Sequence, residues 1–189
     1  QRAARQQKAV HFEAFNPRLG LWAEVHVYPS VEGLTVYFRD VSERKASEHQ
    51  LTLLERSVES STNGVIIADA QSSDLPMVYV NAAFERITGY ARNEALGRNC
   101  RFLQGEDTDP ASVKLMREAV AEQRDVHVVI RNYRRDGKVF WNDLYISPVR
   151  DETGSVTHYL GVQNDVTEQR EYQAQLTYNA NHDALTGLP

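Results

Sequence analysis

Residues 126–164 decide the fold of this chain, and they read VHVVIRNYRRDGKVFWNDLYISPVRDETGSVTHYLGVQN. Three stretches rich in β-branched and aromatic residues, Val126–Tyr133, Val139–Pro148 and Val156–Asn164, alternate with two turn signals. The turn signals are Asp136-Gly137 and Thr153-Gly154, and an Asp-Gly pair between such stretches is typical of a hairpin. The pattern predicts three successive antiparallel strands.

The residues before these strands predict two further strands and a group of helices. Gly64–Ala70 and Met77–Val80 are short apolar stretches around a polar loop, which is typical of a hairpin. Helices are predicted over Ala82–Thr88, Arg92–Leu96 and Pro110–Glu122, where the proline suits a first turn. This order predicts an α+β fold, an antiparallel five-stranded sheet with its helices on one side.

An internal repeat predicts part of a second, related domain at the start of the sequence. Trp22 and Trp141 are each followed seven residues later by a proline, then by a turn, an apolar run and Asp-Val-Ser/Thr-Glu. The first copy predicts two strands, Ala23–Tyr28 and Leu34–Phe38, and then a helix that begins at Ser42. We therefore expect the sequence to be a piece of a longer protein that begins inside a domain.

Composition excludes several classes of protein. Lys and Arg number 21 against 26 Asp and Glu, a net charge of −5, which gives no electrostatic reason to bind nucleic acid or an anionic membrane. No apolar run is long enough to span a bilayer, so we expect a soluble, cytoplasmic protein. The one cysteine, Cys100, excludes an internal disulfide, and the six histidines lack ligand spacing along the sequence, so no metal site is predicted.

One short stretch carries the most specific signal in the chain. Residues 99–104 read NCRFLQ, which resembles the signature of the LOV family, the flavin-binding blue-light sensors of the PAS superfamily. Four more polar residues, Arg117, Asn132, Asn142 and Gln163, fall where that family keeps contacts to the flavin. The resemblance covers about residues 60 to 170. It implies a PAS-type fold and flavin mononucleotide (FMN) as the cofactor.

The residue types themselves suit this cofactor. Guanidinium groups bind phosphate through paired charge-assisted hydrogen bonds, which Arg101 and Arg117 can supply. Carboxamides carry both a donor and an acceptor, so Asn132, Asn142 and Gln163 suit the polar edge of a flavin ring. The other expected contacts are Asn99 and Gln104 from the signature, and Ile66, Leu144, Ile146 and Tyr159 as walls of the ring, although these last four equally suit ordinary core packing.

The resemblance implies a photochemical role for Cys100 and a relay role for Gln163. In LOV proteins the corresponding thiol attacks the flavin C4a carbon after blue-light excitation, N5 is protonated, and the bond breaks again in the dark. A pocket without charge would keep the thiol protonated in darkness. The strand that carries Gln163 leads directly into Asp165-Val166 and the following helix. Gly64 stands where some family members keep an asparagine, so the lifetime of the adduct is left open.

The end of the sequence resembles a second family. Residues 182–189 read HDALTGLP, which is similar to the opening of a GGDEF domain, the diguanylate cyclase module that makes cyclic di-GMP. The predicted organisation is the end of a PAS-like domain over 1–41, a helical linker over 42–60, a LOV domain over 61–166, an output helix over 167–182 and the start of a GGDEF domain over 183–189.

The predicted function is a blue-light sensor that regulates a C-terminal output domain, with no catalytic activity in this part of the chain. An apolar seam at Leu51, Leu54 and Val58 predicts a homodimer formed through the flanking helices. Two alternatives stay open: a redox- or ligand-sensing flavin module without an adduct, and a thiol enzyme that uses Cys100. The thiol enzyme is disfavoured because no histidine lies near this cysteine in the sequence to activate it.

Overall fold

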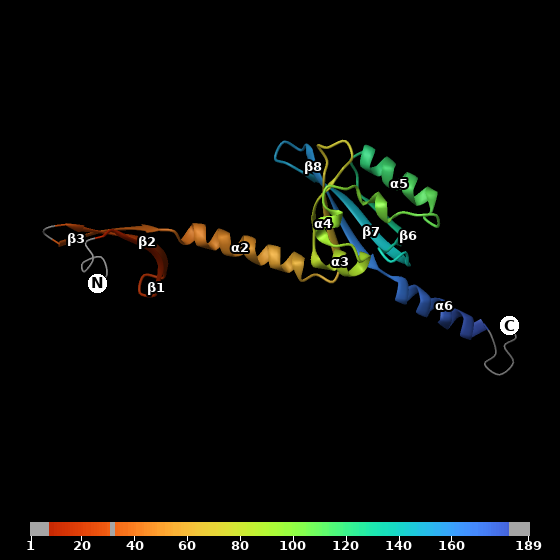
Figure 1. Ribbon diagram of the computed structural model, residues 1–189, viewed down its shortest axis with the longest axis horizontal. Helices are drawn as coiled ribbons and strands as arrows, with labels where there is room; N and C mark the ends of the chain where they lie inside the picture. Colours follow the sequence, from red (N-terminus) through yellow and green to blue (C-terminus); the bar gives the residue numbers. More distant parts are fainter. Residues whose placement is uncertain (1–7, 31–32, 182–189) are drawn as a thin grey trace. The chain divides into compact units, whose positions relative to one another are not determined.

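The computed structural model describes residues 8–30 and 33–181. The chain divides into two compact units, Gln1–Ser57 and Val58–Pro189, each with its own sheet (Figure 1). The predicted start of a GGDEF domain at 183–189, and residue 182 of the predicted output helix, lie outside the described residues.

The first unit contains a three-stranded antiparallel sheet. Its strands are β1 (Val10–Asn16), β2 (Leu21–Ser30) and β3 (Gly33–Asp40), in that order across the sheet. The sequence indicates β2 and β3 but not β1, because no turn residue stands before β1 to mark its start. β2 runs two residues beyond its predicted end at Tyr28, so Pro29 lies inside this strand and pairs with Leu34.

A long helix, α2 (Ser42–Glu59), follows the first sheet where the linker helix is predicted. The Asp40-Val41-Ser42 stretch fixes its start: Ser42 N donates to Asp40 Oδ1 at 2.9 Å, and the Ser42 hydroxyl accepts from Trp22 N at 2.9 Å. No residue of α2 is buried. Leu51 and Leu54 of the predicted seam are exposed, whereas Val58 is half-buried.

The second unit is built on the five-stranded antiparallel sheet that the sequence predicts. The strand order is β5-β4-β8-β7-β6, and all neighbouring strands pair antiparallel. The strands are β4 (Gly64–Asp69), β5 (Met77–Val80), β6 (Val126–Tyr133), β7 (Val139–Arg150) and β8 (Val156–Asp165).

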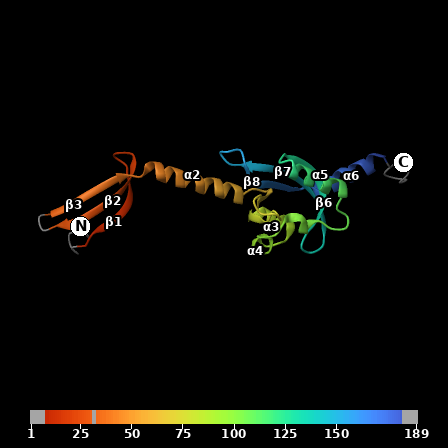
Figure 2. The same ribbon diagram turned by 90° about the horizontal axis from the view of Figure 1, so that it is seen from above.

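The helices of this unit begin at well-formed caps. The side chain of Asn81 accepts from Phe84 N at the start of the first helix, and Asp109 accepts from Ala111 N and Ser112 N at the start of the fourth. Among the described residues, no helix combines the length and the apolar character that crossing a membrane requires. The helices are α3 (Ala82–Thr88), α4 (Arg92–Ala95), the 3₁₀ helix η1 (Cys100–Leu103), α5 (Pro110–Ala121) and α6 (Thr167–Asn181), of which η1 was not predicted (Figure 2).

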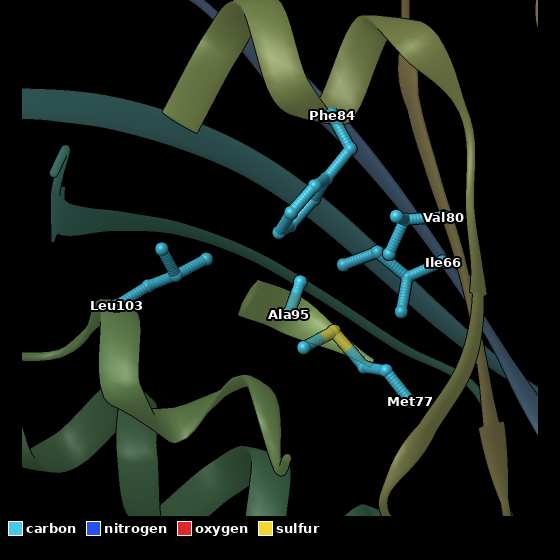
Figure 3. Packing of buried hydrophobic residues seen from close by; sticks show 6 residues of the cluster. All are labelled: Ile66, Met77, Val80, Phe84, Ala95 and Leu103. Atoms are coloured by element: carbon cyan, nitrogen blue, oxygen red, sulfur yellow. The ribbon is translucent and has the colours of Figure 1, made fainter. Parts of the chain in front are cut away.

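The helices α3, α4, η1 and α5 cover one face of the sheet, as predicted, and pack there in two separate apolar clusters. The pairing register places Ile66, Gly161 and Ile146 in one row across β4, β8 and β7, so all three face the same side. The η1 cluster joins β4 and β5 to α3, α4 and η1 through Ile66, Met77, Val80, Phe84, Ala95 and Leu103 (Figure 3). The α5 cluster joins α5 to β6 and β7 through Met116, Ala119, Val126, Val128, Ile130 and Leu144.

The repeat seen in the sequence is also a repeat of hydrogen bonds. In the first unit, Val41 N donates to Trp22 O at 2.9 Å. In the second, Val166 N donates to Trp141 O at 2.9 Å, and the Thr167 hydroxyl accepts from Trp141 N at 2.9 Å, as the Ser42 hydroxyl does from Trp22 N. Each unit thus joins its sheet to the helix that follows in the same way.

Candidate functional site

The sheet residues expected to contact a flavin all lie on the face that the helices cover. Alternate residues of a strand share a face, and residues that pair across strands point to the same side. The register puts Gln163 opposite both Leu144 and Gly64, and Asn142 opposite Ile130. The seven expected contacts that lie on this face are Ile66, Asn132, Asn142, Leu144, Ile146, Tyr159 and Gln163.

Three buried amides on this face lie outside both apolar clusters. Asn132, Asn142 and Gln163 are only 4%, 0% and 2% exposed, and we call them the polar strip. The two clusters share no residue among those that the structure describes. A domain of this size usually has one continuous core. The apolar core is thus interrupted, and the polar strip belongs to neither of its two parts.

The polar strip offers acceptors that the described residues do not satisfy. Asn142 Nδ2 donates to Asn132 Oδ1 at 2.9 Å, which fixes how both amides point. Asn142 Oδ1 and Gln163 Oε1 are buried without a hydrogen-bond partner in the described structure. Each such atom costs about 1–3 kcal/mol. A flavin ring carries N–H as well as carbonyl groups along its edge, so the polar strip fits this cofactor.

Two glycines shape the space beside the polar strip. A methyl group on Gly161 would meet no atom closer than Ile66 Cβ at 3.6 Å, so the protein itself does not require a glycine there. A bare backbone in the row between Ile66 and Ile146 suits close approach of a flat ring. At Gly64, by contrast, a methyl group would come within 3.3 Å of Gln163 Oε1 and of Phe84 Cα, so Gly64 leaves room for the amide.

A cavity of about 270 Å³ opens where η1, α5 and β7 meet. Six of the expected residues line it: Asn99, Cys100, Arg101, Gln104, Arg117 and Ile146. The polar strip, Ile66, Leu144 and Tyr159 are not part of this lining and lie on the sheet face instead. Five lining residues were not expected from the sequence: Leu75, Val113, Met116, Val120 and Ala121.

Cys100 begins η1 and packs against the η1 cluster. Burial raises the pKa of its thiol, and the opposing effects of a backbone hydrogen bond and of Arg101 are smaller. The thiol is therefore protonated at neutral pH. A protonated thiol on an apolar wall is a poor nucleophile until something nearby activates it.

The two arginines at the cavity differ in their surroundings. Arg101 is exposed, and its Nη2 lies 3.0 Å from Asp74 Oδ1. Arg117 is exposed on α5 and makes no ion pair with any residue that the structure describes. Both polar atoms of the Asn99 side chain are already hydrogen-bonded to the backbone. Its Oδ1 accepts from Arg101 N at 2.9 Å and its Nδ2 donates to Asp74 O at 2.6 Å, so Asn99 stabilises the loop.

Comparison with known proteins identifies the family to which the fold belongs. Residues 62–168 match the family model described as a PAS domain. The LOV domain from a blue-light activated histidine kinase of Erythrobacter litoralis superimposes with a TM-score of 0.53 at 44% identity, over 55% of this chain and 95% of that one. The chain belongs to the PAS domain family and carries a LOV domain.

Several relatives of this LOV domain are described as blue-light photoreceptors or blue-light-activated kinases. A "Blue-light photoreceptor" of Listeria monocytogenes is 43% identical over 127 residues, 67% of this chain and 50% of that protein. A "Blue-light-activated histidine kinase 1" of Erythrobacter litoralis is 44% identical over 127 residues, 65% of this chain and 35% of that protein. A structure titled as an RNA-binding light-oxygen-voltage receptor has a TM-score of 0.64 at 37% identity, over 93% of this chain and 43% of that one. The chain spans half or less of the length of these curated relatives.

The residues of the LOV domain that sequence reasoning missed lie mostly on α5. Val113, Met116 and Val120 line the cavity, and their i, i+3, i+7 spacing is the signal of an apolar helix face. Tyr159 was expected to wall the ring. Its hydroxyl donates to Val120 O at 2.7 Å, so Tyr159 also ties β8 to the end of α5.

The LOV domain links the polar strip to α6 over a short distance in sequence. Two residues after Gln163, Asp165 Oδ1 accepts from Thr167 N at 3.0 Å and from its hydroxyl at 2.6 Å. On the opposite face of the sheet, Trp141 is stacked between Arg131 and Arg170, whose guanidinium carbons lie 4.8 and 4.1 Å from the ring centre. These contacts attach the first turn of α6 to β7 and β8.

Proposed function

We propose that this chain is a blue-light sensor that holds FMN in its LOV domain and regulates an output domain through α6. The observation that carries this proposal is the polar strip with its two unpartnered acceptor oxygens, next to a cavity with a protonated thiol and two arginines. Its relatives in Listeria monocytogenes and Erythrobacter litoralis, a blue-light photoreceptor and a blue-light-activated histidine kinase, support it.

Each group of residues has its own task in this proposal. A bound flavin would supply absorption of blue light and a ring carbon that a thiol can attack. Cys100 would supply Sγ for a reversible bond, and the proton that its neutral thiol carries in darkness. Arg101 and Arg117 would bind the phosphate, and the polar strip would bind the ring edge.

Gln163 is the proposed relay. Its Oε1 is a buried acceptor without a partner among the described residues, and an amide can turn to present its Nε2 donor instead. A change in protonation at the ring edge would favour one orientation over the other. Because Asp165 lies two residues further along β8 and caps α6, a turn of this amide reaches the helix through a single strand.

The experiment is a dark-minus-light absorption spectrum of the purified chain and of Cys100→Ala. The wild type is expected to be yellow, to bleach under blue light and to recover in darkness. Cys100→Ala is expected to stay yellow and to lose the reversible bleaching. Ser72→Ala, a comparable removal of a small polar group outside the cavity, should behave like the wild type.

Other outcomes of this experiment would overturn the proposal in distinct ways. A colourless wild type would contradict flavin binding. A yellow wild type that does not bleach reversibly would favour a redox- or ligand-sensing flavin module. Reversible bleaching in Cys100→Ala would show that another group reacts.

We further propose that the output is a diguanylate cyclase and that the sensor acts as a homodimer in the cytoplasm, with neither nucleic acid nor membrane as a partner. The support is the sequence HDALTGLP at 182–189 and the exposed apolar residues of α2. The test is production of cyclic di-GMP from GTP by the longer protein in darkness and under blue light. No product in either condition would contradict the cyclase.

A further inference from the structure

The sheet of the first unit brings together two histidines and a glutamate. His11 on β1 pairs directly with His26 on β2, and Glu24 stands two residues before His26. Paired and alternate residues share a face, so the three side chains point to the same side of the sheet. The spacing of the histidines along the sequence does not indicate this group, because strand pairing rather than sequence proximity assembles it.

The distances within this group match those between ligands of one small cation. His11 Nε2 lies 3.0 Å and His26 Nε2 lies 3.3 Å from Glu24 Oε1. One ligand atom from each residue lies within 4.8 Å of the others. Bonds of about 2.0–2.1 Å to Zn²⁺ in a tetrahedron place neighbouring ligand atoms roughly 3.3 Å apart. Coordination would therefore need little movement of the backbone.

The nearby cations pair with another carboxylate, so Glu24 is available to the two histidines. Glu13 pairs with Glu24 across the strands, but its carboxylate is held by Arg44 at 2.5 Å and by Lys45 at 2.6 Å. Among the described residues, Glu24 Oε1 contacts His11 and His26, and no Lys or Arg lies within ion-pair distance of this carboxylate. The side chains of Glu24, His26 and His11 are 25%, 34% and 57% exposed, which leaves one side of the group open to water.

The second unit provides an internal comparison at the same places in the repeat. His127 on β6 pairs with Tyr145 on β7, and Asp143 stands two residues before Tyr145. His127 Nε2 lies 2.5 Å from Asp143 Oδ1, and its ring stacks on Tyr145 at 3.9 Å between centroids. Both units thus carry a histidine, a carboxylate and an aromatic ring here. Only in the first unit is that ring an imidazole, which adds a third ligand.

We propose that His11, Glu24 and His26 form a binding site for a divalent cation of the zinc class. Two imidazoles and one carboxylate are a donor set that Zn²⁺ prefers, with the fourth position open to water. The site does not depend on the flavin function of the LOV domain, because it lies wholly within the first unit. In the second unit a tyrosine, Tyr145, stands at the place of His26 in the repeat. The substitution His26→Tyr should therefore remove the cation site.

The experiment is calorimetric titration of the metal-free 189-residue chain with Zn²⁺ alone. We expect one Zn²⁺ per chain, at least tenfold weaker binding in His26→Tyr, and a similar loss in Glu24→Gln, which keeps the shape of the side chain. His127→Tyr is the matched control and should bind as the wild type does. Co²⁺ in place of Zn²⁺ should give visible absorption bands of a four-coordinate site in the wild type and not in His26→Tyr.

Two results of the Zn²⁺ titration would overturn the proposal. Equal Zn²⁺ binding by the wild type, His26→Tyr and Glu24→Gln would place any bound metal elsewhere. Absence of one-to-one binding by the wild type would exclude the site. Circular dichroism of each variant separates loss of the ligand from loss of the fold, and Glu24→Gln tests the site if His26→Tyr does not fold.

Discussion

The side-chain oxygen of Gln163 accepts a hydrogen bond from no residue in the described part of the chain, although the side chain is almost completely buried. A substitution that removes a buried acceptor without a hydrogen bond from the flavin-free protein relieves a desolvation cost of about 1–3 kcal/mol. Gln163→Leu should therefore stabilise the flavin-free chain by about 1 kcal/mol, and stabilise the flavin-loaded chain less. Urea unfolding with and without FMN measures both. A Gln163→Leu chain that is less stable without flavin would contradict the proposed role of this oxygen.

Arg101 and Arg117 differ from the other expected contacts because a phosphate is their only proposed target. Replacing both with alanine should weaken FMN binding about tenfold or more, since each charge-assisted hydrogen bond is worth about 1.5–3 kcal/mol before solvent screening. Riboflavin has no phosphate, so its affinity should change little. Fluorescence titration with both flavins checks this, with Arg124→Ala as a control outside the cavity. Equal losses for FMN and riboflavin would show that the two arginines do not bind the phosphate.

Elements with strong local patterns were predictable, and elements set by one side chain were not. β5 and β6 were predicted to the residue, and the other three strands of the sheet to within one or two residues, because alternation and Gly turns mark them. The 3₁₀ helix η1 was missed, since its start depends on the Asn99 cap rather than on any periodicity. The helix predicted over Arg92–Leu96 ends at Ala95, where Leu96 leaves the helical conformation.

The candidate site was predictable where chemistry marks a residue and not where only packing does. The amides of the polar strip were expected because a buried carboxamide needs a polar partner, and the register brings them to one face. The interruption between the two apolar clusters could not be predicted, because it depends on which side chains meet across α5 and η1. The pairing of Arg101 with Asp74 was equally hidden, since the two are far apart in sequence.

The start of α6 depends on Asp165. Burial would raise the pKa of this carboxyl, but hydrogen bonds from Thr167 and Arg134 outweigh it and hold the pKa below its usual value of 3.8. A depressed pKa in the folded state contributes stability above the unfolded pKa, and that stability is lost as the pH falls through the folded pKa. Asp165→Asn should therefore lower the free energy of unfolding by about 1 kcal/mol at pH 7.

The pH dependence of this difference is the decisive measurement. The gap between the wild type and Asp165→Asn should shrink only as the pH falls below 3.8, when the carboxyl of the wild type becomes protonated. Unfolding free energies from pH 7 downwards measure it. Glu168→Gln, which removes a neighbouring charge on α6, should show no such gap. A gap for Asp165→Asn that is constant with pH would mean that the ionised carboxylate is not what anchors the helix.

Over the whole molecule, each unit ends in a helix whose apolar residues are uncovered. On α2 the seam residues Leu51 and Leu54 are exposed, and Leu53 is exposed on another side of the helix; on α6 the exposed residues include Tyr172 and Leu176. Uncovered apolar residues at helical spacing indicate a partner helix, and a second copy of the chain supplies the same seam. The seam of α2 has more leucine than that of α6, so we expect α2 to hold a dimer together and α6 to be the part that can rearrange.

A dimer of this kind would transmit the light signal as a change in the distance between the two copies of α6, while the distance between the two copies of α2 stays the same. Two arrangements of a weak seam lie close in energy, so a change of a few kcal/mol at Gln163 suffices to repopulate them. Spin labels on unnatural amino acids at 55 and 173, which leave Cys100 free, should report an inter-chain distance that changes on illumination at 173 and stays constant at 55. Leu51→Glu with Leu54→Glu should abolish both distances, whereas Leu53→Glu, off the seam, should keep them. An unchanged distance at 173, or a monomer at micromolar concentration in darkness and in light, would rule this mechanism out.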